Sequence, residues 1–308
     1  MTAAVLSFLR SDFVYRFRHD WVAMASFIIF ISMVLAAALA PVLAPFDPYD
    51  STGIDIMDSD MAPVWQESGD TDPRFILGTD VQGRDLFSAL LYGARTSLLI
   101  GVFAVLLQAF LGVSIGLVSG YVGGRIDAFF MRLADIQLSL STLMVAIIAL
   151  AVFQAAFGTE LYAEVAIYML IAVIGIAEWP QYARTVRASV LAERHKEYVD
   201  AARVIGLGRP RIMFRHVLPN TLSPILVIST VQVANAIMSE AALSFLGLGM
   251  PVNKPSLGSL INSGFEFIFS GSWWVTTFPS IVLIVLILSI NLLGDWLRDE
   301  LNPRLYKD

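Results

Sequence analysis

Long apolar segments alternate with short polar ones along the whole chain. The apolar segments cover 21–43, 94–121, 129–157, 162–176, 217–246 and 273–296, and glycine, proline or charged residues bound each of them. Several reach the ~20 apolar residues that an α-helix needs to cross a hydrocarbon core about 30 Å thick. The pattern therefore predicts an all-α polytopic membrane protein with six transmembrane helices.

Composition supports this interpretation and excludes several classes of function. Hydrophobic residues make up 57% of the chain and charged residues 15%, which is too apolar for a soluble globular protein. The absence of cysteine excludes disulfides and thiolate chemistry. A net charge of −6 without a basic, aromatic-interleaved stripe argues against nucleic acid as a partner. The histidines (His19, His195 and His216) are scattered, so no metal site is expected.

Lysine and arginine positions predict which side of the membrane each loop faces. Basic residues are concentrated in the loop 181–216, and cytoplasmic loops carry such an excess. With an even number of spans both termini lie on the same, cytoplasmic side, and both are basic. The predicted organisation is a cytoplasmic segment 1–20, a first transmembrane helix 21–44, an extracytoplasmic loop 45–93, a transmembrane core 94–298 and a cytoplasmic tail 299–308.

The N-terminal segment 1–20 combines aromatic residues with arginines, which predicts a short amphipathic helix on the membrane surface. A frayed terminus is the alternative. The first apolar segment is longer than the ~7–15 residues of a signal peptide, and Pro41 follows its small residues. We therefore expect this segment to remain as a membrane helix.

A charged stretch, 197–210, lies between two apolar segments and predicts a helix, a turn and a second helix. Gly206 and Gly208 suit the end of the first helix, and Pro210 suits the first turn of the second. Pro219 then begins the next apolar segment, where proline costs little. A solvated linker, the alternative, needs neither an apolar face nor paired glycines. The predicted apolar face consists of Tyr198, Ala201, Ala202 and Ile205, and the polar positions are Glu197, Asp200 and Arg203.

The same stretch has the spacing of the EAA loop of ABC importer permeases. The matching positions are Asp200, Ala201, Ala202, Gly206, Leu218 and Pro219. Asp200 replaces the usual glutamate, and His216 replaces a usual hydrophobic residue. Further motifs occur in order at 77–85 (LGTDVQGRD), 92–98 (YGARTSL), 120–124 (GYVGG), 242–249 (ALSFLGLG) and 291–295 (NLLGD). Residues 21–304 therefore resemble the dipeptide, oligopeptide and nickel permease family, in particular the second of its two paired permeases.

This resemblance implies a type I ABC importer permease fold with a cytoplasmic coupling helix, in a bacterial inner membrane. It implies a heteromeric complex with a homologous second permease, two ABC ATPases and an extracytoplasmic substrate-binding protein. The chain has no phosphate-binding loop, so ATP and Mg²⁺ are expected on the ATPases, and no catalytic, cofactor or metal residue is expected here. The residues implied in ATPase coupling are Glu197, Tyr198, Asp200, Ala201, Ala202, Gly206 and Pro210.

Three polar residues within an apolar segment are candidates for the translocation pathway: Gln232, Asn235 and Glu240. Buried acids in a membrane are costly and often functional, but a structural partner for Glu240 is equally consistent. At the outer rim, Asp80, Arg84 and Asp85 are candidates for contact with the binding protein, with a locally capped turn as the alternative.

Two further expectations concern helix geometry. Permeases of this family commonly carry a proline in the third span, where this chain has Ser141 and Thr142, so the kink is expected to be absent or softened. Arg132 and Asp135 are spaced to pair on one helix face.

The resemblance favours import of peptides by family frequency, with nickel, glutathione, haem or opines as alternatives. A stand-alone secondary transporter is the competing class, but the chain lacks a clear internal repeat. A membrane-embedded enzyme is disfavoured because no Ser/His/Asp constellation, His-Glu-x-x-His run or pair of intramembrane aspartates occurs.

Overall fold

The computed structural model describes residues 12–50, 55–66, 71–251 and 253–301, which form helices joined by turns and one isolated bridge between Thr79 and Asp85. The first half contains α2 (Asp12–His19), α3 (Trp21–Ala38), α4 (Ala40–Leu43), the 3-10 turn η1 (Ile56–Asp58), α5 (Leu86–Val122), α6 (Gly124–Ser139) and α7 (Thr142–Phe157). The second half contains α8 (Thr159–Glu193), α9 (Glu197–Val204), α10 (Arg209–Ile212), the π turn η2 (Met213–Val217), the 3-10 turn η3 (Leu218–Thr221), α11 (Leu222–Phe245), α12 (Leu257–Phe265) and α13 (Trp273–Glu300).

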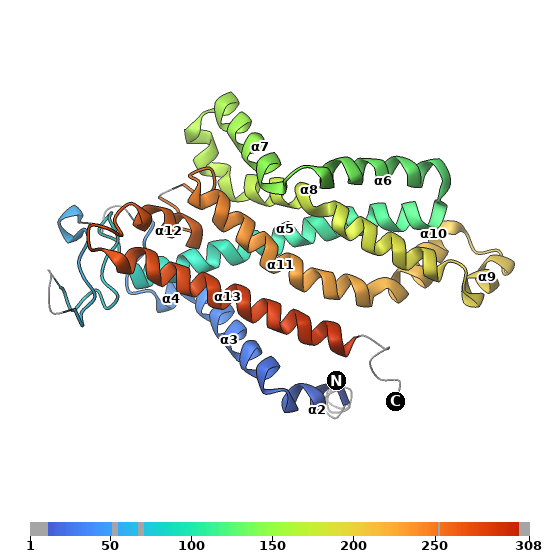
Figure 1. Ribbon diagram of the computed structural model, residues 1–308, viewed down its shortest axis with the longest axis horizontal. Coiled ribbons are helices and arrows are strands. Elements are labelled where there is room, and N and C mark those ends of the chain that lie inside the picture. The colour runs from blue at the N-terminus through green and yellow to red at the C-terminus, as the bar shows by residue number, and fades with distance from the viewer. Residues whose placement is uncertain (1–11, 51–54, 67–70, 252, 302–308) are drawn as a thin grey trace.

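Four long helices, α5, α8, α11 and α13, run along the long axis of the molecule, and α3 leans against their side (Figure 1). Within the described residues, five helical segments are long and apolar enough to cross a membrane, or six if the bent pair of α6 and α7 is one span. The outward faces remain rich in exposed large hydrophobic side chains, as lipid contact requires. The predicted polytopic all-α fold is thus confirmed.

Helices α5 and α8 approach closely because α5 presents glycines to α8. A Cβ atom added at Gly112 would lie 2.3 Å from the Tyr182 Cβ atom, and one added at Gly116 would lie 2.5 Å from the Ala183 carbonyl oxygen. Small residues let membrane helices gain van der Waals contact in the absence of a hydrophobic driving force between them. This contact fixes the centre of the bundle.

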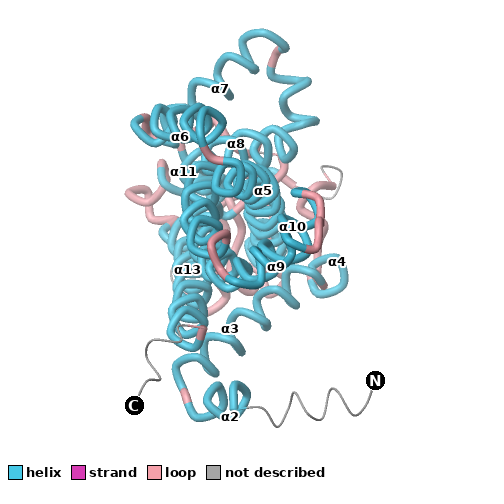
Figure 2. The backbone as a smooth tube through the Cα atoms, turned by 90° about the vertical axis from the view of Figure 1, so that its right-hand side faces the viewer, coloured by secondary structure: helices cyan, strands magenta, loops and turns pink. Residues whose placement is uncertain are grey.

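The third predicted span is sharply broken, so the expectation of a softened kink at Ser141 was wrong. Helices α6 and α7 meet at an angle of 87°, and α7 projects from the side of the bundle (Figures 1 and 2). Leu140 and Ser141 have extended backbone at the break. Extended residues interrupt a helix, so the chain bends here without a proline. Asp135 forms an ion pair with Arg184 of α8 and none with Arg132, which corrects the predicted pairing.

Helix α8 continues through Pro180, although proline removes one backbone hydrogen bond inside a helix. The carbonyl of Ile176, four residues earlier, accepts a hydrogen bond from Gln137 Nε2 of α6 at 2.6 Å. The Gln137 Oε1 atom accepts a bond of 2.9 Å from Trp179 Nε1. Because α6 replaces the lost bond, α8 stays helical to Glu193, well beyond the predicted apolar segment 162–176.

The beginning and the end of the described chain lie side by side. Arg16 of α2 pairs with Glu300 of α13 at 2.7 Å, and the rings of Phe17 and Trp296 are 4.9 Å apart. Helix α2 lies within the predicted N-terminal segment 1–20, whose residues 1–11 lie outside the described part of the chain. The position of this segment on a membrane surface stays a prediction. Both ends of the described chain therefore lie at the same end of the bundle.

Candidate functional site

The segment 194–221, which we call the α9 elbow, projects beyond the ends of α8 and α11 (Figure 1). Figure 2 views the bundle from this end, with α9 and α10 toward the viewer. Tyr198 Oη donates to the Glu193 carboxylate at 2.8 Å, and Lys196 Nζ pairs with the other Glu193 oxygen at 2.6 Å. These bonds attach the first turn of α9 directly to the end of α8.

One face of α9 packs inward and the other is exposed. Val199 and Ala202 are buried, whereas Val204 is 88% and Ile205 77% exposed. The predicted apolar face was therefore only partly right: Ala202 and the half-buried Tyr198 face the protein, but Ala201 and Ile205 face outward. Val199 was missed because a short helix allows two registers for its apolar positions. The exposed pair of aliphatic residues is an unpartnered apolar tip, a feature typical of a protein interaction site.

The turn after α9 is formed as the sequence predicts, except at one glycine. Gly206 has a φ of +84°, and its N–H donates to the Arg203 carbonyl at 2.9 Å. Gly208 instead has an ordinary φ of −63°. Pro210 lies in the first turn of α10, as predicted, and Pro219 lies in the first turn of η3. From α10 the chain continues through η2 and η3 into α11 with little interruption.

Arginines connect the elbow to the bundle. Arg194 Nη1 donates to the Gly120 carbonyl at the end of α5 at 2.9 Å. Arg203 pairs with Asp200 at 2.8 Å, donates to the Arg194 carbonyl at 3.2 Å and lies over the Tyr121 ring at 5.8 Å. The elbow is thus bonded to the end of α5, follows α8 directly and continues into α11.

Tyr198 stays a hydrogen-bond donor throughout the physiological pH range. Partial burial, reinforced by the hydrogen bond to the Glu193 carboxylate, raises the pKa of the Tyr198 phenol from its ordinary 10.0 to about 12. Asn220 Nδ2 of η3 lies 3.4 Å from the same hydroxyl. The phenol of Tyr198 therefore stays protonated while it contacts Glu193 on one side and Asn220 on the other.

Of the predicted pathway residues, Gln232 and Asn235 lie together and Glu240 lies apart. Asn235 Nδ2 donates to Gln232 Oε1 at 3.0 Å, and Gln232 Nε2 donates to Glu178 Oε2 at 3.1 Å. Glu178 was missed because it follows the predicted apolar segment and precedes Pro180, a residue that usually ends helices.

Glu240 is fully buried, and both its carboxylate oxygens accept hydrogen bonds. Ser97 of α5 and Ser244 of α11 each donate at 2.6 Å. Ser97 Oγ in turn accepts from the Leu257 N–H, and Ser244 Oγ accepts from the Met250 N–H. This network joins α5, α11 and α12, as the structural alternative for Glu240 expects, and a place for Glu240 in the pathway stays a prediction.

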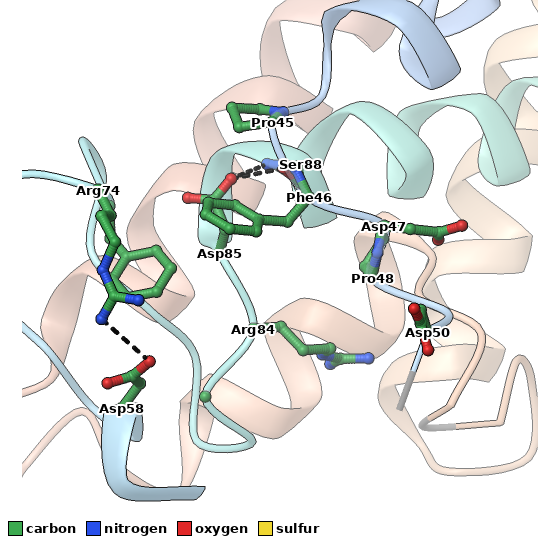
Figure 3. Close-up of a pocket in the computed structure, with 12 residues that line it drawn as sticks. Pro45, Phe46, Asp47, Pro48, Asp50, Asp58, Arg74, Arg84, Asp85 and Ser88 are labelled. Atoms are coloured by element: carbon green, nitrogen blue, oxygen red, sulfur yellow. Dashed lines mark hydrogen bonds and ion pairs between the residues drawn. The ribbon is translucent and has the colours of Figure 1, made fainter. Parts of the chain in front are cut away.

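At the opposite end, Asp80, Arg84 and Asp85 form a compact turn. Asp80 Oδ2 accepts from Arg84 Nη2 at 2.6 Å, with the aspartate side chain 0% and the arginine side chain 3% exposed. Asp85 caps α5 by accepting from the Ser88 N–H at 2.8 Å (Figure 3). Burial raises the pKa of the Asp85 carboxyl, against the opposing effect of these hydrogen bonds. The structure has the capped turn of the alternative, with Asp80 and Arg84 buried within the chain, and contact of these residues with a binding protein stays a prediction.

The same turn borders a cavity of about 240 Å³ that Asp47, Asp58 and Arg74 also line (Figure 3). In the part of the chain that the structure describes, no group of three or more histidine, aspartate or glutamate side chains is arranged to hold a metal ion.

A bundle of apolar helices long enough to cross a membrane, with one short helix projecting from its end, defines a polytopic membrane protein. Residues 112–307 match the binding-protein-dependent transport system inner membrane component family, and residues 7–63 match the N-terminal transmembrane domain of oligopeptide transport permease C. The chain belongs to the binding-protein-dependent transport system inner membrane component family.

Similar curated proteins cover nearly the whole chain. The dipeptide transport system permease protein DppC of Haemophilus influenzae is 36% identical over 294 residues, covering 96% of this chain and 94% of that protein. The oligopeptide transport system permease protein OppC of Bacillus subtilis is 35% identical, covering 97% of this chain and 91% of its own length.

Among solved structures, the inward-facing MetNI methionine ABC transporter has a chain that matches with a TM-score of 0.55 at 16% identity. The match covers 70% of this chain and 96% of that one. The fold is accordingly that of a type I ABC importer permease.

Proposed function

We propose that this chain is one of two homologous permease subunits of an ATP-driven peptide importer and forms half of its translocation pathway. The observation that carries the proposal is the α9 elbow, which presents an exposed apolar tip while being bonded to three membrane helices. The names of the relatives, which are dipeptide and oligopeptide permeases, support peptides as cargo.

In this proposal the apolar tip of α9 docks in a cleft of an ABC ATPase. Val204 and Ile205 fill the cleft, and the exposed Glu197 and Asp200 carboxylates contact its rim. Closure of two ATPases around ATP and Mg²⁺ displaces α9. The bonds through Glu193, Arg194 and Asn220 pass this displacement to the membrane helices, which alternate between two packings.

The proposed orientation places the α9 elbow and both termini in the cytoplasm of a bacterial cell. The excess of arginine and lysine around the elbow supports it, because cytoplasmic loops carry such residues. The acidic turn region 44–85 and α12 then face outward, toward a substrate-binding protein. A second permease packs against the lipid-embedded bundle and completes the pathway.

The test is reconstitution. We expect ATP-dependent uptake of a dipeptide into proteoliposomes when this chain is combined with its second permease, the ATPases and a loaded binding protein. Uptake by the chain alone, without ATPases, would establish a stand-alone transporter and overturn the proposal. Uptake of a nickel chelate, glutathione, haem or an opine in place of peptides would overturn only the cargo.

A further inference from the structure

A layer of polar side chains crosses the bundle near the middle of three membrane helices. Gln108 comes from α5, Glu178 from α8 and Gln232 from α11, and all three are buried. Gln232 Nε2 lies 3.3 Å from Gln108 Oε1 and 3.1 Å from Glu178 Oε2. Polar and ionisable groups at this depth are costly, and they commonly face a pathway for polar solutes.

Only one of the two carboxylate oxygens of Glu178 accepts hydrogen bonds from the described residues. Its Oε2 atom accepts from Gln181 Nε2 at 2.8 Å and from Gln232 Nε2 at 3.1 Å. Its other carboxylate oxygen accepts no hydrogen bond from the described residues, and none of the ion pairs among those residues includes it. The residue is 8% exposed. A carboxylate at this depth without a cation is an incomplete site, because a buried charge needs a partner.

Both amides that donate to Glu178 line a groove of about 710 Å³ between α8, α11 and α13. The groove has apolar walls that include Val227 and Val231, and it reaches Asn220 and Arg298 at the end of the molecule that carries the α9 elbow. Glu178 itself does not line the groove and lies one hydrogen bond behind two of the residues that do. The groove joins the middle of the bundle to one membrane face.

The second buried glutamate provides a contrast within the same bundle. Both Glu240 oxygens are occupied by serine hydroxyls, and the side chain is 0% exposed. Neither of those serines lines the groove. Both Glu240 oxygens thus accept hydrogen bonds, whereas only one Glu178 oxygen does, and the two amides that donate to it line the groove.

We propose that Glu178 is the counter-charge for a cationic side chain of the transported peptide, at a mid-membrane subsite in the translocation pathway. Gln232 and Asn235 supply amide donors and acceptors for the peptide backbone beside it. A peptide ammonium completes the unsatisfied carboxylate, and the apolar groove walls accommodate the rest of the solute. This inference rests on the proposed function, since it requires that the chain lines a peptide pathway.

The experiment uses the complete transporter in proteoliposomes, with binding protein saturated by Ala-Lys, Ala-Ala or Ala-Glu. Maximal uptake rates at saturation report passage through the membrane and not capture by the binding protein. We expect Glu178→Gln to lower the ratio of Ala-Lys to Ala-Glu uptake by roughly fivefold, as loss of one partly desolvated charge contact does. Glu178→Asp is expected to retain the ratio, and Asn235→Asp to raise it. Glu240→Gln, the matched control, leaves it unchanged.

An unchanged ratio in Glu178→Gln together with normal uptake would overturn the inference while leaving peptide import intact. If Glu178→Gln does not assemble, an unchanged ratio in Asn235→Asp overturns it equally. Absence of dipeptide uptake by the unaltered transporter would instead remove the proposed cargo.

Groove occupancy is tested separately, because the chain contains no cysteine of its own. We expect Val231→Cys in the assembled complex to react with a charged maleimide added on the α9 side. Failure to react would show that a partner helix or lipid fills the groove, and that result would also overturn the inference.

Discussion

The α9 elbow and the Thr79–Asp85 turn lie at opposite ends of the bundle and use similar residues in opposite ways. Each combines charged residues with a glycine in the left-handed region, Gly206 in one and Gly83 in the other. In the outer turn Asp80 and Arg84 are buried against each other. In the elbow, Asp200 and Arg203 remain exposed and two aliphatic side chains project outward.

Burial, and not charge, distinguishes the two turns. In the outer turn, Trp274 Nε1 of α13 donates to the Thr79 carbonyl at 3.2 Å, so the turn locks the start of α5 against α13. A Cβ atom at Gly83 would lie 2.3 Å from the Asp55 carbonyl oxygen. At Gly206 the corresponding position has no neighbour within 4 Å. The first turn is closed by its own chain, and the second is open to another protein.

The largest effect is expected at the outer turn. Arg84→Ala leaves the Asp80 carboxylate buried without its cation and should lower the free energy of unfolding by about 3–5 kcal/mol, measured by thermal unfolding in detergent. The matched control is Arg74→Ala, whose side chain is 58% exposed in its ion pairs and whose loss should cost below about 1 kcal/mol. Equal losses at both arginines would contradict a structural role for the buried pair.

At the elbow, substitution should affect assembly and leave stability unchanged. The double variant Val204→Asp with Ile205→Asp should weaken ATPase binding roughly 30-fold, about 2 kcal/mol, because it places charge in an apolar contact. Binding is measured by titrating ATPase onto the purified permease pair. Phe269→Asp, at a 95% exposed residue at the outer end, is the control and should bind normally. A large loss of thermal stability in the elbow variant would instead indicate an internal role for these residues.

A smaller effect separates the two elbow glycines. Gly206→Ala must adopt a left-handed backbone, which should cost about 1 kcal/mol and reduce coupled ATP hydrolysis. Gly208→Ala has ordinary φ and open space, so its effect should stay within about 0.5 kcal/mol. Unfolding and stimulated ATPase rates of the two variants provide the comparison. Indistinguishable variants would show that the turn conformation is not constrained.

The smallest expected effect concerns Tyr198. Tyr198→Phe removes one hydrogen bond to Glu193 and should cost about 0.5 kcal/mol. Because the folded pKa is raised to about 12 above the ordinary 10.0, the contribution of this residue is complete below pH 10 and is lost as pH rises toward 12. The difference in stability between the variant and the unaltered chain should therefore be constant from pH 6 to about 9. A difference that changes within this range would mean that another group controls the contact.

Much of the fold was predictable because the length and apolarity of a segment are enough to identify a membrane-spanning helix. The turn of the elbow was equally readable from Gly206 and Pro210, whose backbone preferences are local. The outward face of α9 was not, because the burial of Val199 depends on how α8 and α11 are placed. Glu178 was missed for a related reason: Pro180 argued for a helix end, and only Gln137 of α6, distant in sequence, keeps α8 helical there.

The break between α6 and α7 also depends on tertiary structure. Ser141 lacks the ring of proline, yet α6 is held along α8 by Asp127–Arg187 and Asp135–Arg184 ion pairs while α7 turns away. Ion pairs between residues so far apart in the sequence cannot be predicted from the local pattern of apolar and polar residues.

Contact between the tip of α9 and an ATPase can be tested by crosslinking, because the chain has no cysteine of its own. Ile205→Cys in the assembled complex, treated with a short thiol-to-amine crosslinker, should yield a product containing this chain and an ATPase subunit. Phe269→Cys should not. A crosslink from Phe269→Cys to the ATPase with none from Ile205→Cys would contradict contact between the α9 tip and the ATPase.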